Sequence, residues 1–186
     1  MQTDHRDQLI VALDVPELDQ ARQLVTTLGD TVNFYKVGME LVYGQGFGFI
    51  KELTSAGKKV FLDLKLHDIP NTVQKATEQI ARLGVTFLTV HAYPQTMRAA
   101  KAGSLSSAMR ILGVTVMTSY DDQDLRDAGY DKAVRDVVRL RAEAARDIGI
   151  GGLILSPEEV AAMRAHIGRD LLLVTPGIRP ADSASD

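Results

Sequence analysis

The chain has 186 residues, of which 45% are apolar and 24% charged, a composition typical of a globular protein with one domain spanning residues 1–186. Its net charge of −3, without a basic cluster, argues against nucleic acid and anionic lipid as partners, and no apolar run reaches the roughly 18 to 20 residues of a membrane span. The absence of cysteine excludes disulfides and thiolate chemistry, so we expect a cytoplasmic protein that binds a small molecule.

Seven short runs of β-branched or leucine-rich residues predict buried strands. They lie at Leu9–Leu13, Phe34–Val37, Lys59–Leu64, Phe87–Val90, Ile111–Met117, Gly152–Leu155 and Leu171–Val174. The segments between them carry apolar residues at helical spacing, most clearly over residues 18–28 and 134–148. Ser156, Pro157 and Glu159 have the pattern of a helix start, and glycines follow several of the expected helix ends. The order of elements is therefore strand then helix, repeated.

This alternation predicts an α/β fold with a parallel sheet. The expected strands begin about 27 residues apart, which is the length of a βα unit. The first strand is followed by no GxGxxG motif, so we favour a (β/α)₈ TIM barrel over a doubly wound open sheet. Only seven units are visible, and the small, polar residues 181–186 follow. We expect the eighth βα unit to be missing from this chain, with an open variant of the fold as the alternative.

Polar residues follow the expected strands, and they would gather at one mouth of the barrel. They are Asp14, Lys36, Asp63, Lys65, His91, Thr118, Ser119, Ser156 and Arg179. Active sites of barrel enzymes lie at this mouth. Asp63 and Lys65 stand two positions apart on a strand, so they should share a face, with Leu64 turned away.

Asp14 and Lys36 could complete a neutral cluster of two anions and two cations with this pair. A self-contained ion-pair network is the simpler interpretation, but burying four such groups costs several kcal/mol. Ammonium groups where a divalent cation would bind also argue against a metal site.

Weaker candidates lie elsewhere. Residues 44–48, with the sequence GQGFG, are either a phosphate-binding loop or the start of a helix. His91 is either an orienting residue or a proton carrier, whereas His5 and His166 are expected at the surface. The charges of residues 121–127 are most simply a solvated helix start.

Residues 63–72, DLKLHDIPNT, resemble the D-x-K-x-x-D-I-P-x-T signature of the orotidine 5′-phosphate decarboxylase family. The similarity runs along nearly the whole chain and includes Ala12–Asp14, Phe34–Gly38, Leu88–Ala92, Gly113–Ser119 and Thr175–Pro180. It implies a cytoplasmic homodimer with shared active sites. Its implied reaction converts orotidine 5′-phosphate (OMP) to UMP and CO₂, the last step of de novo pyrimidine nucleotide synthesis, with no cofactor and no metal.

The resemblance also implies roles for individual residues. Lys65 would be the proton donor in a charged network with Lys36 and Asp63, completed by Asp68 from the other subunit. The implied substrate contacts are Asp14 and Lys36 to the ribose, Thr72 to the ribose across the interface, Thr118 or Ser119 to the pyrimidine, Arg179 to the phosphate, and Ile69 and Pro176 beside the substrate. The family's phosphate-binding Gln and its Gly-Arg on the eighth strand have no counterpart in this chain.

Two alternatives remain open. Sugar-phosphate decarboxylases and hexulose-phosphate synthases share the D-x-K-x-x-D pattern but employ Mg²⁺; the run from Asp68 to Thr72, together with Lys36, argues against them. The other alternative is a nucleotide-binding or dimerisation module without catalytic activity.

Overall fold

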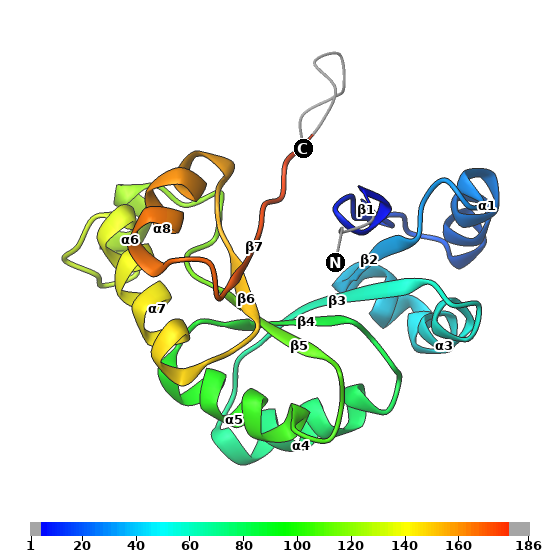
Figure 1. The fold of residues 1–186 in the computed structure, drawn as a ribbon, viewed down its shortest axis with the longest axis horizontal. Coiled ribbons are helices and arrows are strands. Elements are labelled where there is room, and N and C mark those ends of the chain that lie inside the picture. The colour runs from blue at the N-terminus through cyan, green and yellow to red at the C-terminus, as the bar shows by residue number, and fades with distance from the viewer. Residues whose placement is uncertain (1–4, 179–186) are drawn as a thin grey trace.

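A computed structural model describes residues 5–178 and contains one parallel sheet of seven strands in chain order. The strands are β1 (Val11–Ala12), β2 (Phe34–Gly38), β3 (Lys59–Leu66), β4 (Phe87–His91), β5 (Arg110–Val114), β6 (Gly152–Ile154) and β7 (Leu172–Val174). Each predicted strand is thus confirmed. In Figure 1 the sheet curls so that β1 and β7 both lie toward the top of the picture.

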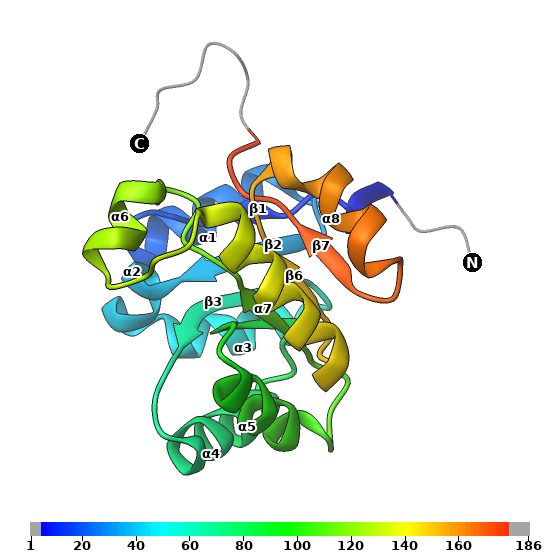
Figure 2. The ribbon, with the colours of Figure 1, turned by 90° about the vertical axis from the view of Figure 1, so that its left-hand side faces the viewer.

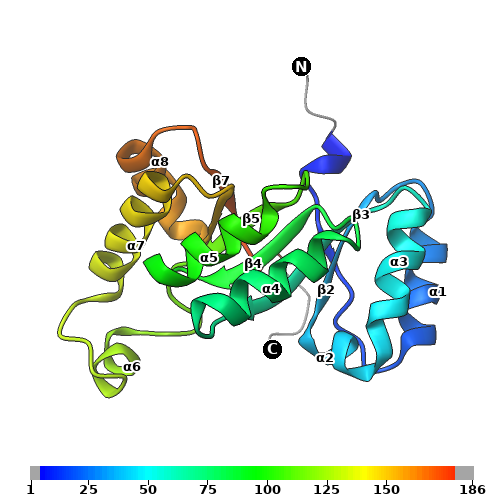
Figure 3. The same ribbon diagram turned by 90° about the horizontal axis from the view of Figure 1, so that it is seen from below.

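Helices connect successive strands and cover the outside of the curled sheet (Figures 1 and 3). They are η1 (His5–Asp7), α1 (Leu18–Leu28), α2 (Met39–Leu41), η2 (Val42–Gly46), α3 (Phe47–Ser55), α4 (Pro70–Ala81), α5 (Pro94–Ser104), α6 (Asp122–Asp127), α7 (Val134–Ile148), η3 (Pro157–Glu159) and α8 (Val160–Ile167). Within residues 5–178, none of these helices is long and apolar enough to cross a membrane. The sequence periodicity predicted α1 and α7 with these same bounds.

Alternating side chains on the strands build two apolar layers. The layer between sheet and helices includes Leu62 and Leu88 and draws on both kinds of element. The layer on the concave face is made by strand residues such as Phe34, Phe61 and Phe87. Because strand side chains alternate with a period of two, the residues two positions further along continue on this concave face. On the concave face, a layer of phenylalanines therefore precedes the polar residues at the carboxyl ends of the strands.

The two ends of the sheet agree with the expectation of a barrel that lacks its eighth unit. Within residues 5–178 there is no eighth strand, so β1 pairs only with β2, and β7 only with β6. The architecture is a curled, TIM-barrel-like sheet of seven βα units. Arg179, the expected phosphate ligand, lies outside the described residues.

The strand β5 ends three residues earlier than predicted. The sequence predicts a strand as far as Met117, whereas β5 ends at Val114. The next carbonyl, that of Thr115, accepts a hydrogen bond from the Arg141 guanidinium on α7, and the Thr115 hydroxyl donates to the carbonyl of Ile154 at 3.2 Å. The backbone N–H of Thr115 also donates to the Ile154 carbonyl, at 3.4 Å, so Thr115 remains bonded to β6 beyond the end of β5.

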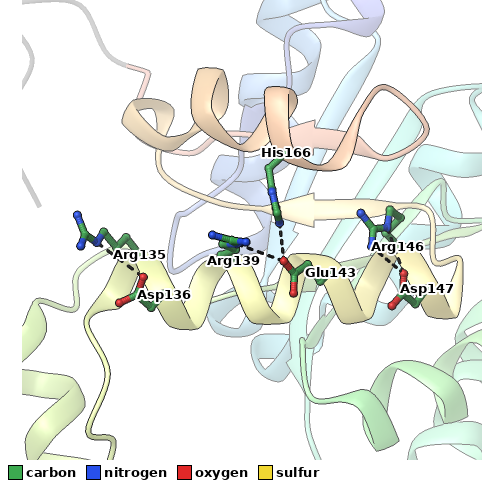
Figure 4. Close-up of polar contacts among 7 residues, drawn as sticks. All are labelled: Arg135, Asp136, Arg139, Glu143, Arg146, Asp147 and His166. Carbon is green, nitrogen blue, oxygen red and sulfur yellow. Dashed lines mark hydrogen bonds and ion pairs between the residues drawn. The ribbon is translucent and has the colours of Figure 1, made fainter.

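The helices α6, α7 and α8 cover the side of the sheet formed by its later strands (Figure 2). α7 ends at Gly149, which adopts the left-handed conformation with φ of 73° that ends many helices. Between α7 and α8, His166 Nε2 lies 2.6 Å from Glu143 Oε1, and Arg139 reaches the same oxygen at 3.2 Å (Figure 4). His166 is therefore half-buried and engaged between two helices, where the sequence predicted a surface residue.

Candidate active site

Two Asp–Lys ion pairs lie at the carboxyl ends of the first three strands. Lys36 Nζ contacts both carboxylate oxygens of Asp14, at 2.7 and 3.0 Å. Lys65 Nζ lies 2.9 Å from Asp63 Oδ2. Within the described part of the chain, no hydrogen bond or ion pair joins one pair to the other. The predicted four-charge group is thus present as two separate pairs in this chain.

The two pairs differ in their access to water. The Asp14 side chain is 58% exposed, whereas that of Asp63 is 15% exposed. Both lysine side chains are largely covered. An ion pair removed from water interacts more strongly than an exposed one because the effective dielectric is lower. The Asp63–Lys65 pair is therefore the stronger candidate for electrostatic chemistry.

An irregularity in β3 places Lys65. Leu62 pairs with Leu88 and Leu66 pairs with Val90, so four steps along β3 match two steps along β4. The extra length forms a bulge, a feature that turns side chains in new directions. Lys65 lies within it at φ of 49°, the left-handed region that glycine favours. The pairing of Asp63 with Lys65 was predicted from strand alternation, but a bulged backbone produces it.

Thr89 on β4 holds this bulge together, and sequence analysis did not select it. Its hydroxyl donates to Asp63 Oδ1 at 2.7 Å and accepts from the backbone N–H of Lys65 at 3.0 Å. The side chain is fully buried. One signal was available in the sequence, because Thr89 stands two positions after Phe87 and so shares the concave face.

Gly38, at the end of β2, borders the more exposed pair. A Cβ atom at this position would lie 3.3 Å from Asp14 Oδ1 and 3.6 Å from Lys36 Nζ. The backbone at Gly38 is extended, with φ of −95°, so its conformation suits any residue. Glycine is thus matched here to the space that the ion pair needs.

An aromatic and cationic cluster adjoins the site on the β4 side. The His67 ring stacks on the Tyr93 ring with centroids 4.6 Å apart. The Arg141 guanidinium also packs on the Tyr93 ring, 4.4 Å from its centroid. The Tyr130 hydroxyl is 2.7 Å from that of Tyr93 and accepts from Arg141 at 2.9 Å. This cluster ties the loops after β3 and β4 to α7.

His91 lies beside this cluster, with its ring centroid 5.7 Å from that of His67. Burial lowers the pKa of His91 below its usual value, and the nearby charges of His67, Arg141 and Lys65 lower it further. A lowered pKa leaves the ring uncharged at neutral pH. This favours an orienting role for His91 over that of a cationic acid.

The remaining predicted residues within 5–178 follow β3, β5 and β7 in the chain, and they form no hydrogen bond or ion pair with the two Asp–Lys pairs. Asp68, Ile69, Thr72, Thr118, Ser119 and Pro176 are all exposed. Asp68 Oδ1 accepts from the N–H of Ile69 at 2.6 Å, so the carboxylate is turned to its own loop. Their exposure leaves these side chains accessible to a ligand or to a second chain.

Two open interpretations are resolved by the local structure. The glycine-rich residues 44–48 are helical: a turn of π-helix, η2, leads directly into α3, which favours the helix start over a phosphate loop. Asp121 caps α6 by accepting from the N–H groups of Gln123 and Asp124, as expected of a solvated helix start. In residues 5–178, no three His, Asp or Glu side chains are grouped as metal ligands.

A curled parallel sheet, helices on its outer face and charged side chains at the carboxyl ends of its strands define the class of (β/α)-barrel enzymes. The sequence pattern of the "Orotidine 5'-phosphate decarboxylase / HUMPS family" matches residues 7–186. The chain belongs to this family.

Individual relatives agree with this placement. The chain is 60% identical over 177 residues to the orotidine 5'-phosphate decarboxylase of Bradyrhizobium sp. (strain ORS 278). The matched residues make up 95% of this chain and 73% of the relative. Identity to the protein of the same name from Rhodopseudomonas palustris (strain HaA2) is 59% over 180 residues, 97% of this chain and 77% of the relative. The crystal structure of orotidine 5'-phosphate decarboxylase from Lactobacillus acidophilus matches with a TM-score of 0.88 at 44% identity, over 93% of this chain and 82% of that one.

Proposed function

We propose that this chain decarboxylates OMP to UMP and CO₂, the last step of de novo pyrimidine nucleotide synthesis, without metal or cofactor. The observation that carries the proposal is the covered Asp63–Lys65 pair, whose atoms lie 2.9 Å apart at the mouth of the curled sheet. The name shared by its relatives supports the same reaction. We place the reaction in the cytoplasm, as the cysteine-free composition suggests.

The chemistry of the reaction requires electrostatic help. When the C6–carboxylate bond of the pyrimidine breaks, its electron pair stays on C6 in an orbital perpendicular to the ring π system, so the ring does not delocalise the charge. The Lys65 ammonium would stabilise this carbanion in a site of low dielectric and then transfer a proton to C6. The neutral amine would regain its proton from water. Asp63, beside the substrate carboxylate, would disfavour the ground state and be relieved as CO₂ leaves.

The other predicted residues would bind the rest of the substrate. Asp14 and Lys36 would hold the ribose hydroxyls, and Thr118 or Ser119 would contact the pyrimidine, with Pro176 nearby. Arg179 would bind the phosphate. Because the phosphate is remote from the breaking bond, its binding energy would raise the rate as well as the affinity.

We further propose a homodimer in which Asp68, Ile69 and Thr72 complete the partner's site. Their exposure supports this, since the Ile69 side chain is 67% exposed beside the start of α4. Asp68 makes its hydrogen bond within its own loop rather than with Lys65 of the same chain. A carboxylate that is exposed in one subunit can thus serve the site of another.

Replacing Lys65 with alanine tests the reaction. Lys65→Ala should lower decarboxylation by about 10⁴-fold or more, because both the counter-charge and the proton are removed. The measurement is the absorbance change as OMP becomes UMP, with circular dichroism to verify folding. Lys51→Ala is the matched control, since Lys51 is exposed on α3. Appreciable activity in Lys65→Ala would overturn the proposed mechanism.

Mixing two inactive variants tests the shared site. Chains carrying Lys65→Ala and chains carrying Asp68→Ala should regain activity together, because a heterodimer has one site with both residues intact. Random pairing would restore about a quarter of the sites of wild type. Heterodimer formation is verified with two affinity tags. Confirmed heterodimers without activity would place Asp68 in the same site as its own Lys65.

The name of the family also includes a second group, HUMPS, and Mg²⁺-dependent sugar-phosphate enzymes are the alternative that shares the D-x-K-x-x-D pattern. Turnover of OMP that is unchanged by EDTA supports our proposal. Turnover of a sugar phosphate that EDTA abolishes would favour the second group. Binding of UMP without turnover of either substrate would indicate a module without catalytic activity.

A further inference from the structure

We propose that Thr89 is a positioning residue that sets the Asp63–Lys65 pair in its reactive arrangement. This inference rests on the proposed function, because it assigns to Thr89 the placement of the two groups argued to act on the substrate. The juxtaposition that carries it is a single buried hydroxyl bonded both to the carboxylate of Asp63 and to the backbone of Lys65.

The two oxygens of the Asp63 carboxylate have different partners, Thr89 and Lys65. Thr89 donates to Oδ1 at 2.7 Å, and Lys65 Nζ donates to Oδ2 at 2.9 Å. Because Oδ1 is held by Thr89 on β4, rotation of the carboxylate is restricted and Oδ2 stays directed at the Lys65 ammonium. A restrained carboxylate would keep the lysine amine in one place rather than let it sample several.

The hydroxyl oxygen of Thr89 also restrains the backbone of Lys65. It accepts from the Lys65 N–H at 3.0 Å, in the middle of the β3 bulge where regular pairing with β4 is interrupted. An N–H group that is removed from water and left without a partner destabilises the fold. Thr89 supplies that partner at the residue whose φ of 49° is unusual for lysine.

Thr89 therefore joins the two halves of the pair through one atom. Its position on β4 is itself rigid, because Leu88 and Val90 on either side are fully buried and the strand is paired with β5 along its length. A hydroxyl on a central strand is a firmer support than one on a loop.

Four substitutions test this role. Thr89→Val has nearly the same shape but neither donates nor accepts, Thr89→Ser keeps the hydroxyl, and Thr89→Cys has a thiol that donates and accepts only weakly. The matched control is Thr77→Val, because Thr77 is also fully buried and its hydroxyl donates only to the Val73 carbonyl of its own helix, at 2.8 Å.

We expect Thr89→Val to lower kcat for OMP by about 10- to 100-fold while KM stays within about twofold of wild type, since the pair is misplaced but the substrate contacts remain. Thr89→Ser should restore most of kcat, and Thr89→Cys should fall between the two. Thr77→Val should leave kcat unchanged even where its melting temperature falls. If Thr89→Val does not fold, the ratio of Thr89→Cys to Thr89→Ser carries the same comparison.

Crystal structures of the wild type and Thr89→Val test the positioning without turnover. We expect the Asp63 carboxylate to rotate and the Lys65 backbone to shift in the variant. Unchanged geometry, or an unchanged kcat, would overturn the inference. A wild-type kcat in Thr89→Val together with an inactive Lys65→Ala would refute only the role of Thr89. Full activity in Lys65→Ala would refute the proposed mechanism, and a wild type that does not turn over OMP would refute the proposed function itself.

Discussion

Gly38 leaves space for the side chains of Asp14 and Lys36 because it has no side chain of its own. Alanine at position 38 would bring its Cβ within 3.3 Å of Asp14 Oδ1, closer than carbon and oxygen normally pack. The acidic and basic side chains would then leave their preferred rotamers, at a cost on the order of 1 kcal/mol. Because Gly38 has an extended backbone, this crowding is separable from any effect on the strand.

Gly38→Ala should therefore raise KM for OMP by about fivefold with little change in melting temperature. The matched control is Gly48→Ala: no atom lies within 4 Å of its added Cβ, and alanine in α3 should add roughly 0.5 to 1 kcal/mol of stability. Steady-state kinetics and thermal unfolding of both variants decide the matter. An unchanged KM in Gly38→Ala would show that the pair tolerates the methyl group or does not contact the substrate.

Single residues show how far sequence reasoning reaches. Alternation along a strand predicted that Asp63 and Lys65 lie side by side with Leu64 turned away, and the structure has this arrangement, although a bulge in β3 rather than regular alternation produces it. It did not predict the left-handed backbone of Lys65, because a bulge depends on how β3 registers with β4. Thr89 was missed for a related reason: threonine is common in strands, and its two hydrogen bonds exist only once the bulge has formed.

At the scale of elements, the contact between α7 and α8 responds to pH. Hydrogen bonds from His166 and Arg139 lower the pKa of Glu143 below its usual value. A carboxylate whose pKa is lower in the folded state stabilises the fold above its unfolded pKa, and this contribution is lost as pH falls through the folded pKa. The contribution of the Glu143 carboxylate to the α7–α8 contact should thus be lost in acid.

His166→Ala should raise the pKa of Glu143 toward its usual value, because the largest cause of the shift is removed. Carboxyl carbon NMR titration measures this directly, and the melting temperature should fall slightly at neutral pH but converge with wild type in acid. Arg135→Ala is the control, since Arg135 on the same helix faces Asp136 at 3.7 Å (Figure 4). A Glu143 pKa that is unaffected by His166→Ala would contradict the assigned contact.

Element boundaries were predictable where local chemistry decides them. The helix start at Ser156 and the left-handed glycine after α7 follow from side-chain capping and backbone sterics alone. The early end of β5 was not predictable, because it depends on Arg141, which lies 26 residues from Thr115 along the chain. Contacts of this kind appear only when the helix has packed on the sheet.

At the scale of the whole molecule, alternation of strands and helices predicted a parallel sheet, but it does not distinguish a barrel from an open sheet. The curl of the sheet decides that question, and it arises from twist summed over all seven strands. The seven βα units nevertheless leave two edges: within residues 5–178, β1 and β7 each have one neighbour. Their free N–H and C=O groups are open to pairing with other chains.

A chain of residues 1–186 should therefore aggregate more readily than one extended by an eighth βα unit, because the added strand would cover both edges. It should also bind UMP about tenfold more weakly or worse, since Arg179 alone would face a phosphate of nearly two charges. Light scattering, UMP titration and OMP turnover on the two chains measure this. Equal solubility and activity would mean that the seven-unit sheet is sufficient.

The left-handed backbone at Lys65 sets stability against activity. Among residues 5–178, Lys65 is the only residue other than glycine with a positive φ, and this conformation costs a side chain about 1 to 2 kcal/mol. Glycine would relieve that cost but would carry no amine. Selection for heat resistance alone would thus favour the loss of the side chain that supplies the proton in the proposed chemistry, so any engineering of a more stable form should hold position 65 constant and seek its gains elsewhere.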